Sequence, residues 1–231
     1  MRLAALGLLC GASTASAGPC LVPGLSPEAL TPGDAAIDQL GGVVIAAVPD
    51  AGGISTDPVV QPWEFVEGTA RTTAKVTRLA PGLAIYAPKR GGERLGLEDA
   101  KGHTVVAVSY RFQQLDDMPM DEAPRPTGIL HTRKVPRFRS ESTIATLSSP
   151  PPAGTVALIV RDARSQSGQA RSFVQITDPT TTSVEIYLRD RCRPEVPKTI
   201  ATRAGDRVKL AWVDAEGHVS LWSAAIEVKA R

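Results

Sequence analysis

The chain has 231 residues, of which 26 are lysine or arginine and 24 are aspartate or glutamate, so its formal net charge is only +2. With 42% hydrophobic and 22% charged residues, the composition excludes an intrinsically disordered chain, a multipass membrane protein and a strongly basic nucleic-acid-binding protein. The 20 glycines and 19 prolines favour many short elements that are joined by turns.

The first 17 residues have the pattern of a secretory signal peptide. Arg2 provides a short basic segment, residues 3–9 are apolar, and residues 15–17 form a small-x-small cleavage site. The apolar run is too short to be a permanent membrane anchor. We therefore expect cleavage after Ala17 and a mature chain that is secreted or periplasmic and does not insert into a membrane.

The cysteines predict one disulfide bond. Of the three cysteines, Cys10 would be removed with the signal peptide, which leaves Cys20 and Cys192. An even number of cysteines in an oxidising compartment favours a disulfide between them, with free thiols or an intermolecular bond as the alternatives. Two cysteines and three histidines are too few for a recognisable zinc cluster.

Between residues 18 and 115 the chain alternates short apolar runs with turn residues. The clearest strand pattern is at residues 106–112, where Val106, Val108 and Tyr110 alternate with residues of the opposite face. Further strands are expected at residues 43–48, 63–66, 73–78 and 83–87. Helical turns are expected only at Pro27–Leu30 and Leu97–Ala100.

Residues 116–127 differ in composition from the segments on either side. They are acidic and interrupted by proline, which indicates a linker or an exposed connecting loop. A basic run at residues 133–139 follows shortly after them. This run could bind an anionic glycan, a lipid head group or an acidic partner, or it could only neutralise the acidic loop.

Strand patterns resume in the C-terminal half of the chain. Strands are expected at residues 143–147, 155–160, 173–176, 184–188 and 226–228. The strongest local pattern is a hairpin, in which residues 208–213 and 219–222 flank a turn that contains Gly217. Trp212 and Trp222 lie on either side of this turn, and we expect one of them to be buried in the core.

The spacing of these elements indicates the fold class. Strands at intervals of roughly 8–12 residues, with no long amphipathic helix, are typical of antiparallel β-sandwiches. Each half of the chain has about the size of one immunoglobulin-like domain. The sequence therefore predicts an all-β protein with two antiparallel immunoglobulin-like β-sandwich domains in tandem, at residues 18–115 and 128–231.

Several segments resemble those of known bacterial domains. Residues 32–36 leading into 42–45, and residues 79–82 before Ile85 and Tyr86, resemble bacterial immunoglobulin-like repeats of secreted proteins. The closing stretch from Gly205 through Trp212 to Leu221 is similar to the last hairpin of fibronectin type III-like domains. This resemblance implies a sandwich fold, and it implies no catalytic residues.

The sequence contains no recognisable catalytic motif: no G-x-S-x-G elbow, H-E-x-x-H pair, P-loop or G-x-G-x-x-G segment after a strand. His103 and His218 are expected at the surface or at strand edges rather than as ligands. We therefore expect neither an enzyme nor a cofactor, but a secreted or periplasmic protein that acts through binding or structural interaction. Its partner would be a protein or a glycan, and the balanced charge argues against nucleic acid.

A periplasmic copper carrier is the main alternative. Met118 and Met120 form a Met-x-Met pattern, and thioethers are suited to Cu(I). Asp117, Asp121 or His131 could complete such a site. The two methionines could instead fill the seam between two domains, since methionine packs adaptably. A hydrolase that uses paired carboxylates is a third and less favoured hypothesis.

Overall fold

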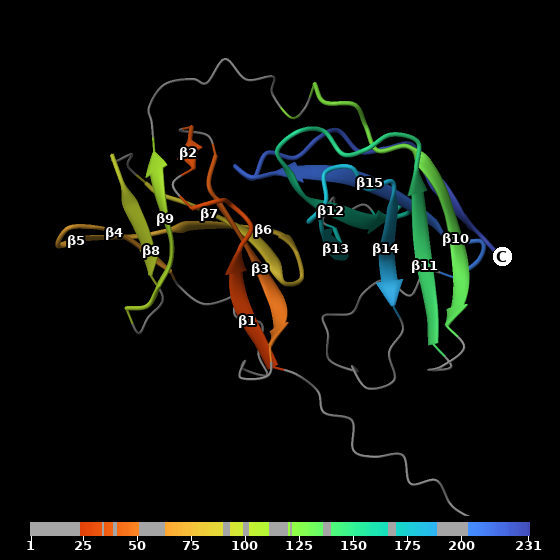
Figure 1. Cartoon of the computed structure of the whole chain (residues 1–231), viewed down its shortest axis with the longest axis horizontal. Coiled ribbons are helices and arrows are strands. Elements are labelled where there is room, and N and C mark those ends of the chain that lie inside the picture. The colour runs from red at the N-terminus through yellow and green to blue at the C-terminus, as the bar shows by residue number, and fades with distance from the viewer. Residues whose placement is uncertain are drawn as a thin grey trace, which may run out of the picture.

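The computed structural model describes residues 24–33, 35–38, 41–50, 63–89, 93–98, 102–110, 120, 122–135, 140–165, 170–188 and 203–231. These residues form strands and turns and no helix, so the prediction of an all-β protein is confirmed. Accordingly, the described part of the chain has no helix long and apolar enough to cross a membrane. The strands lie in two groups, one from each half of the chain, which pack side by side (Figure 1).

The N-terminal half contains two sheets. Its strands are β1 (Gly24–Ala29), β2 (Ala36–Ile37), β3 (Val43–Asp50), β4 (Glu64–Glu67), β5 (Ala70–Thr73), β6 (Lys75–Ala80), β7 (Leu83–Ala87), β8 (Leu95–Glu98) and β9 (Thr104–Tyr110). The order β1-β3-β7-β6 forms a four-stranded sheet, and the order β2-β9-β8-β4-β5 forms a five-stranded sheet. The pairs are antiparallel apart from β2 and β9, which run parallel.

The C-terminal half forms one seven-stranded sheet. Its strands are β10 (Gly128–Val135), β11 (Ser140–Leu147), β12 (Thr155–Asp162), β13 (Ser172–Gln175), β14 (Ser183–Leu188), β15 (Arg207–Asp214) and β16 (Ile226–Lys229). In the order β13-β12-β15-β16-β10-β11-β14, the two end strands β13 and β14 are in contact, so the sheet curls around its own core. Strands β10 and β16 are parallel. The sheets are antiparallel as predicted, except for the parallel pairs β2–β9 and β10–β16.

Both expected helical turns are wrong. Pro27 and Glu28 belong to the edge strand β1, which pairs with β3 in antiparallel register. Leu97 belongs to β8, in which the buried residues Leu95 and Leu97 alternate with the half-buried residues Gly96 and Glu98. This alternation has the period of two that is typical of a strand, and it decided the structure of the segment against its local helical preference.

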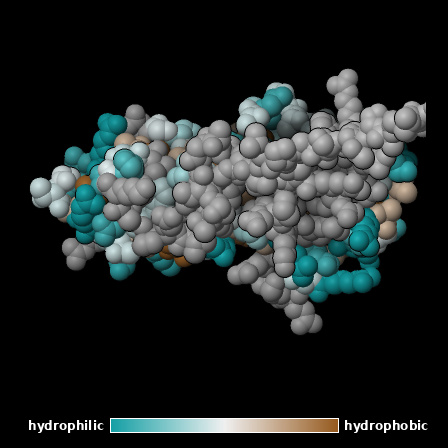
Figure 2. Space-filling view, turned by 90° about the horizontal axis from the view of Figure 1, so that it is seen from below, coloured by the Kyte–Doolittle hydropathy of each residue, from teal (hydrophilic) through white to brown (hydrophobic). Residues whose placement is uncertain are grey.

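Three clusters of buried apolar side chains hold the molecule together. The first core lies between the two N-terminal sheets, and the second core lies inside the curled C-terminal sheet. The third cluster joins the two halves, and we call it the shared core. Its buried members are Leu30, Val44, Ala46, Ala80, Leu83, Ala157, Ile159, Ala170, Ala211 and Val213. Described hydrophilic side chains lie at both ends of the face shown in Figure 2.

The shared core explains the uninterrupted apolar runs in the sequence. In β3, Val43 and Ile45 pack in the first core, whereas Val44 and Ala46 point to the other face and pack in the shared core. Strands β12 and β15 likewise contribute alternate side chains to the second core and to the shared core. A strand that is covered on both faces needs apolar residues at successive positions. The four-stranded sheet is thus a middle layer between the five-stranded sheet and the C-terminal half.

The predicted C-terminal hairpin forms its turn but not a full ladder. Trp212 is 2% exposed and packs in the second core, which confirms that one of the two tryptophans anchors the core. After the turn, Val219 makes an isolated antiparallel bridge with Val213. The returning segment then pairs with β15 through backbone and side-chain groups together. The N–H groups of Ser220 and Ser223 donate to the carbonyls of Trp212 and Leu210 at 3.0 and 2.8 Å. The hydroxyl oxygens of the same serines accept the N–H groups of Trp212 and Leu210 at 2.9 Å each.

Candidate functional site

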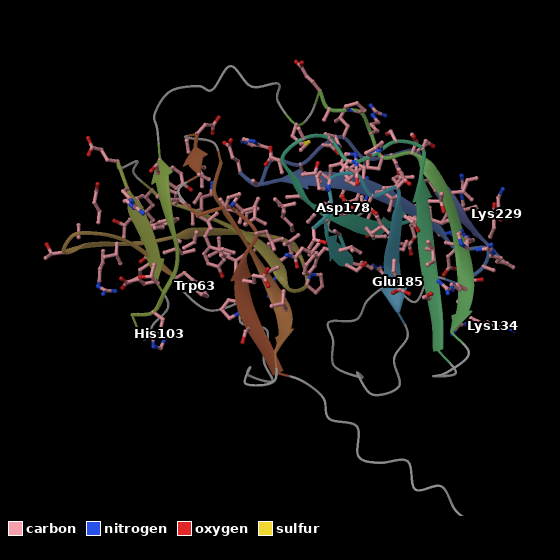
Figure 3. The ribbon with its side chains drawn as sticks, viewed as in Figure 1. Trp63, His103, Lys134, Asp178, Glu185 and Lys229 are labelled. Atoms are coloured by element: carbon pink, nitrogen blue, oxygen red, sulfur yellow. The ribbon has the colours of Figure 1, made fainter. Side chains whose placement is uncertain are left out.

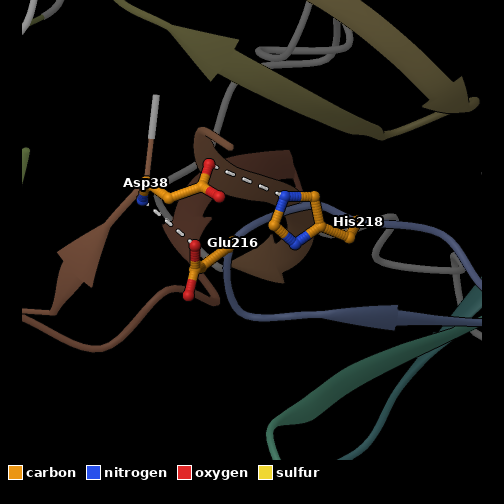
Figure 4. A group of neighbouring side chains, drawn as sticks. All are labelled: Asp38, Glu216 and His218. Atoms are coloured by element: carbon orange, nitrogen blue, oxygen red, sulfur yellow. Dashed lines mark hydrogen bonds and ion pairs between the residues drawn. The ribbon is translucent and has the colours of Figure 1, made fainter. Parts of the chain in front are cut away.

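A group of three carboxylates and one imidazole lies where the two halves meet. Asp38 follows β2 in the N-terminal half. Asp214 ends β15, and Glu216 and His218 belong to the turn after it, in the C-terminal half. Figure 4 shows the side chains of Asp38, Glu216 and His218 converging from the two halves. We call these four residues the seam cluster.

Local sequence shapes the turn that carries Glu216 and His218. The Oδ1 atom of Asp214 accepts the backbone N–H groups of Glu216 at 2.9 Å and of His218 at 2.8 Å. Gly217 has a φ of 86°, a left-handed conformation that glycine adopts without steric cost. Its N–H donates to the backbone carbonyl of Asp214 at 3.1 Å. The turn is therefore fixed by its own residues before it meets the other half.

Two glycines allow this turn to dock against the N-terminal half. The N–H of Gly42 donates to the backbone carbonyl of Glu216 at 2.7 Å. A Cβ atom on Gly41 would lie 3.1 Å from that same carbonyl oxygen, and one on Gly42 would lie 2.5 Å from Cγ2 of Ile85. Thr31 adds a hydrogen bond from its hydroxyl to the carbonyl of Ala215 at 2.5 Å. A side chain at position 41 would therefore push the two halves apart, and one at position 42 would clash with β7 of its own half.

The polar atoms of the seam cluster are closely spaced. Nδ1 of His218 lies 3.1 Å from Oδ2 of Asp214, and its Nε2 lies 3.9 Å from Oδ1 of Asp38. Oε2 of Glu216 accepts the backbone N–H of Asp38 at 3.1 Å. The cluster thus presents one imidazole nitrogen and several carboxylate oxygens toward one point between the halves.

Burial and mutual charge shift the pKa values in this cluster. The pKa of Glu216 is raised, mainly because burial disfavours its charged form and further by the charges of Asp214 and Asp38. The pKa of His218 is also raised, mainly by its hydrogen bond to Asp214. Burial, with the charges of Glu216 and Asp38, raises the pKa of the nearby Tyr110 as well. The arrangement is suited to holding a proton or a metal cation.

A second feature is a positively charged hollow at the outer flank of the C-terminal half. It has a volume of about 470 Å³ and is lined by Thr132, Arg133 and Lys134 of β10 and by Arg231. Lys229 lies next to it, because β16 pairs with β10 in a register that sets His131 opposite Lys229. Figure 3 shows Lys134 and Lys229 on this same flank. We call Arg133, Lys134, Lys229 and Arg231 the basic hollow.

Within the part of the chain that the structure describes, the cations of the basic hollow have no acidic partners. All four side chains are exposed, and within the described residues none of them forms an ion pair. Arg231 lies beside the imidazole of His131, with its Nη1 at 3.4 Å from Nε2. The hollow is therefore a cluster of like charges that an anion could neutralise.

A larger groove lies along β1 and β9 in the N-terminal half. It has a volume of about 670 Å³, and its lining mixes apolar residues such as Pro27 and Val106 with Glu28, Arg94 and Thr104. Glu28 accepts a hydrogen bond at 3.1 Å from the side chain of Gln175 in the other half. The groove carries both signs of charge and favours no ligand class.

The residues predicted as copper ligands are not brought together by what the structure describes. Met120 is 6% exposed and packs among the apolar side chains of the second core. His131 is half-buried on β10, with Nε2 toward Arg231. Met118 lies outside the described residues, so the copper hypothesis stays a prediction without structural support.

The signal peptide at residues 1–17 and the proposed disulfide pair, Cys20 and Cys192, also lie outside the described residues. Of the two histidines expected at the surface, His103 is exposed. His218 is not a simple surface residue, because its side chain is 33% exposed and lies within the seam cluster. The spacing of Asp214, Glu216 and His218 on one turn was the signal available in the sequence. The sequence contained no such signal for Asp38, which lies 178 residues before Glu216.

Comparison with known proteins adds no assignment. No protein-family model matches this chain, and no curated protein matches it either.

Proposed function

We propose that this protein is an exported, non-enzymatic binding protein, built from two immunoglobulin-like domains, that holds an anionic glycan at the basic hollow. The observation that carries the proposal is a concave surface lined by the exposed cations Arg133, Lys134 and Arg231, with Lys229 beside it, without acidic partners among the described residues. The signal-peptide pattern of the first 17 residues supports export.

The strand order supports an immunoglobulin-like architecture in the N-terminal half. In that fold, strands A, B, E and D form one sheet, and strands C, F and G form the other. Taken in chain order, β1-β3-β7-β6 corresponds to A-B-E-D, and β9-β8-β4-β5 corresponds to G-F-C with an added C′ strand. Trp63, which is 2% exposed, directly precedes β4, close to where such domains bury a tryptophan on strand C.

The C-terminal half supports the same assignment with a variation. The segment β13-β12-β15-β16 corresponds to C′-C-F-G, and β10-β11-β14 corresponds to A-B-E. The parallel pair of β10 and β16 joins these two groups into one curled sheet. No described strand occupies the place of D between β13 and β14.

The shared core supports a rigid scaffold rather than two freely moving domains. Fully buried side chains from β3 and β7 pack against those from β12 and β15, and hydrogen bonds cross the seam beside them. A fixed placement of the two domains lowers the entropic cost of binding, because the surfaces are already ordered. Binding proteins benefit from such preorganisation.

The chemistry of the basic hollow favours an anionic ligand. Guanidinium groups pair with carboxylate, sulfate or phosphate groups through two parallel hydrogen bonds. A volume of about 470 Å³ falls within the usual range for ligand sites. The cations are spread along the ends of two neighbouring strands, and Thr132 also lines the hollow. A glycan chain, with repeated anionic groups and hydroxyls, matches this distribution.

The test measures binding of heparin, as a defined anionic polysaccharide, to the mature chain. We expect wild type to bind with an affinity that falls with added salt, and the double variant Arg133→Gln/Lys134→Gln to bind at least tenfold more weakly. Lys75→Gln/Lys89→Gln removes two exposed lysines from the N-terminal half and serves as the matched control, with unchanged binding expected.

Three other outcomes would contradict the proposal. Equal losses in the two double variants would mean that heparin senses only net charge. If polyglutamate bound more tightly than heparin, and this binding depended on Arg133, the ligand of the hollow would be an acidic protein instead of a glycan. Cleavage of the heparin chain would overturn the non-enzymatic part.

A further inference from the structure

We propose that the seam cluster binds one divalent transition-metal ion of the zinc type, which connects the two halves of the protein. Asp38 would supply a ligand from the N-terminal half, and Glu216 and His218 would supply ligands from the C-terminal half. This inference is independent of the basic hollow, which lies on β10 and at the chain end after β16.

The ligand atoms already lie close together. One donor atom from each of Asp38, Glu216 and His218 can be chosen so that all three lie within 4.8 Å of one another. Around zinc, with bonds of about 2.1 Å, neighbouring ligand atoms in a tetrahedral site are about 3.4 Å apart. Small rotations of the three partly exposed side chains are enough to reach this spacing. The fourth position would be open to water.

The orientation of His218 is that of a metal-binding histidine. Its Nδ1 lies 3.1 Å from Oδ2 of Asp214, which fixes Nδ1 as the protonated nitrogen and leaves Nε2 free to accept a metal. Metal-binding histidines almost always donate their other ring N–H to a carboxylate, a carbonyl or water. Nε2 of His218 lies on the side of Asp38, at 3.9 Å from its Oδ1. Asp214 is therefore a positioning residue for the proposed site.

The charge balance of the cluster also favours a cation. Three carboxylates surround one imidazole, and neither Asp214 nor Glu216 forms an ion pair with a lysine or arginine in the described chain. The backbone hydrogen bond from Gly42 to Glu216 keeps the acidic groups of the two halves together at the seam. A divalent ion would neutralise most of the excess charge. The imidazole ligand favours zinc and related metals over Ca²⁺ and Mg²⁺, which prefer oxygen.

The test is a titration of the metal-free mature chain with Zn²⁺, followed by calorimetry and by the melting temperature. Wild type should bind one equivalent and melt at a higher temperature with Zn²⁺ than in EDTA, whereas Ca²⁺ and Mg²⁺ should have no effect. His218→Gln, Glu216→Gln and Asp38→Asn should each weaken Zn²⁺ binding at least tenfold. Their melting temperatures in EDTA show whether each variant is folded.

Asp214→Asn separates a positioning role from a structural one. The asparagine keeps an oxygen for the turn N–H groups but cannot accept the Nδ1–H of His218 with its amide nitrogen, so Zn²⁺ binding should fall about 10–100-fold. His103→Gln removes an exposed histidine as the matched control and should leave binding unchanged. Absence of Zn²⁺ binding, binding that survives His218→Gln, or binding that is lost in Cys20→Ser/Cys192→Ser would overturn the proposal.

Discussion

Replacing Leu83 by alanine tests whether the shared core couples the two halves. Leu83 lies on β7, is 0% exposed and packs in the cluster that contains residues of β3, β12 and β15. The substitution removes three buried carbon atoms, which costs about 2.4 kcal/mol at about 0.8 kcal/mol per methylene. The surrounding strands are held by their ladders and cannot close the cavity fully, so we expect a total loss of about 3–4 kcal/mol.

The assay is urea unfolding, followed by tryptophan fluorescence, with Leu221→Ala as the matched control. Leu221 is 48% exposed, and the same truncation there should cost less than about 0.5 kcal/mol. With a urea m-value of about 2–3 kcal/mol/M, the Leu83→Ala midpoint should fall by more than about 1 M. Because the core is shared, the variant should also unfold in two steps where wild type unfolds in one. Similar midpoints for the two leucine variants would refute a shared core around Leu83.

The raised pKa values of His218 and Glu216 predict that, in EDTA, the folded protein loses stability as the pH rises. Because both pKa values are raised on folding, the folded state holds more protons than the unfolded state. The stabilisation from protonated His218 is complete below pH about 6.5 and is lost as the pH rises through the folded pKa of His218. The stabilisation from protonated Glu216 is lost in the same way above pH about 4.5. The melting temperature should therefore fall between pH 4 and pH 9, and the double variant Glu216→Gln/His218→Gln should show a smaller fall. An equal fall in the double variant would contradict the idea that these two residues cause the pH dependence. From the sequence we also expect the exported chain to begin at Gly18 and to contain a Cys20–Cys192 disulfide. Mass spectrometry of the alkylated, unreduced protein checks both points, and two alkylated thiols would show that the bond is absent.

Local patterns predicted much of the strand structure. The alternation of Val106, Val108 and Tyr110 placed a strand with those three side chains inward, and all three are buried on β9. The same reasoning failed at Leu97, where a short charged segment with good helix formers gave a helical expectation for what is the strand β8. Helix propensity is a weak preference, and the buried position of Leu95 and Leu97 against β9 overrode it.

The predicted linker shows a different limit of the sequence. Residues 116–127 were expected to be a linker or an exposed loop because they are acidic and rich in proline. Met120, within this range, is buried in the second core, and Pro126 is buried as well. Composition describes the average of a segment, whereas burial of a single side chain depends on which surface the segment crosses. The part of the range that the structure describes is thus anchored to the C-terminal half.

The sequence by itself determined the all-β class, the position of most strands and the turn of Asp214, Glu216 and His218, because strand periodicity and turn chemistry involve residues that are near one another in the chain. The continuous apolar run of Val43 to Ala46 also indicated a buried strand. Only the tertiary structure decided which residues cover the second face of this strand. It also decided that Asp38 meets Glu216, which is 178 residues later in the chain. Both depend on how two folded surfaces dock, through the glycines at 41 and 42 and the shared core, and no local pattern encodes that contact.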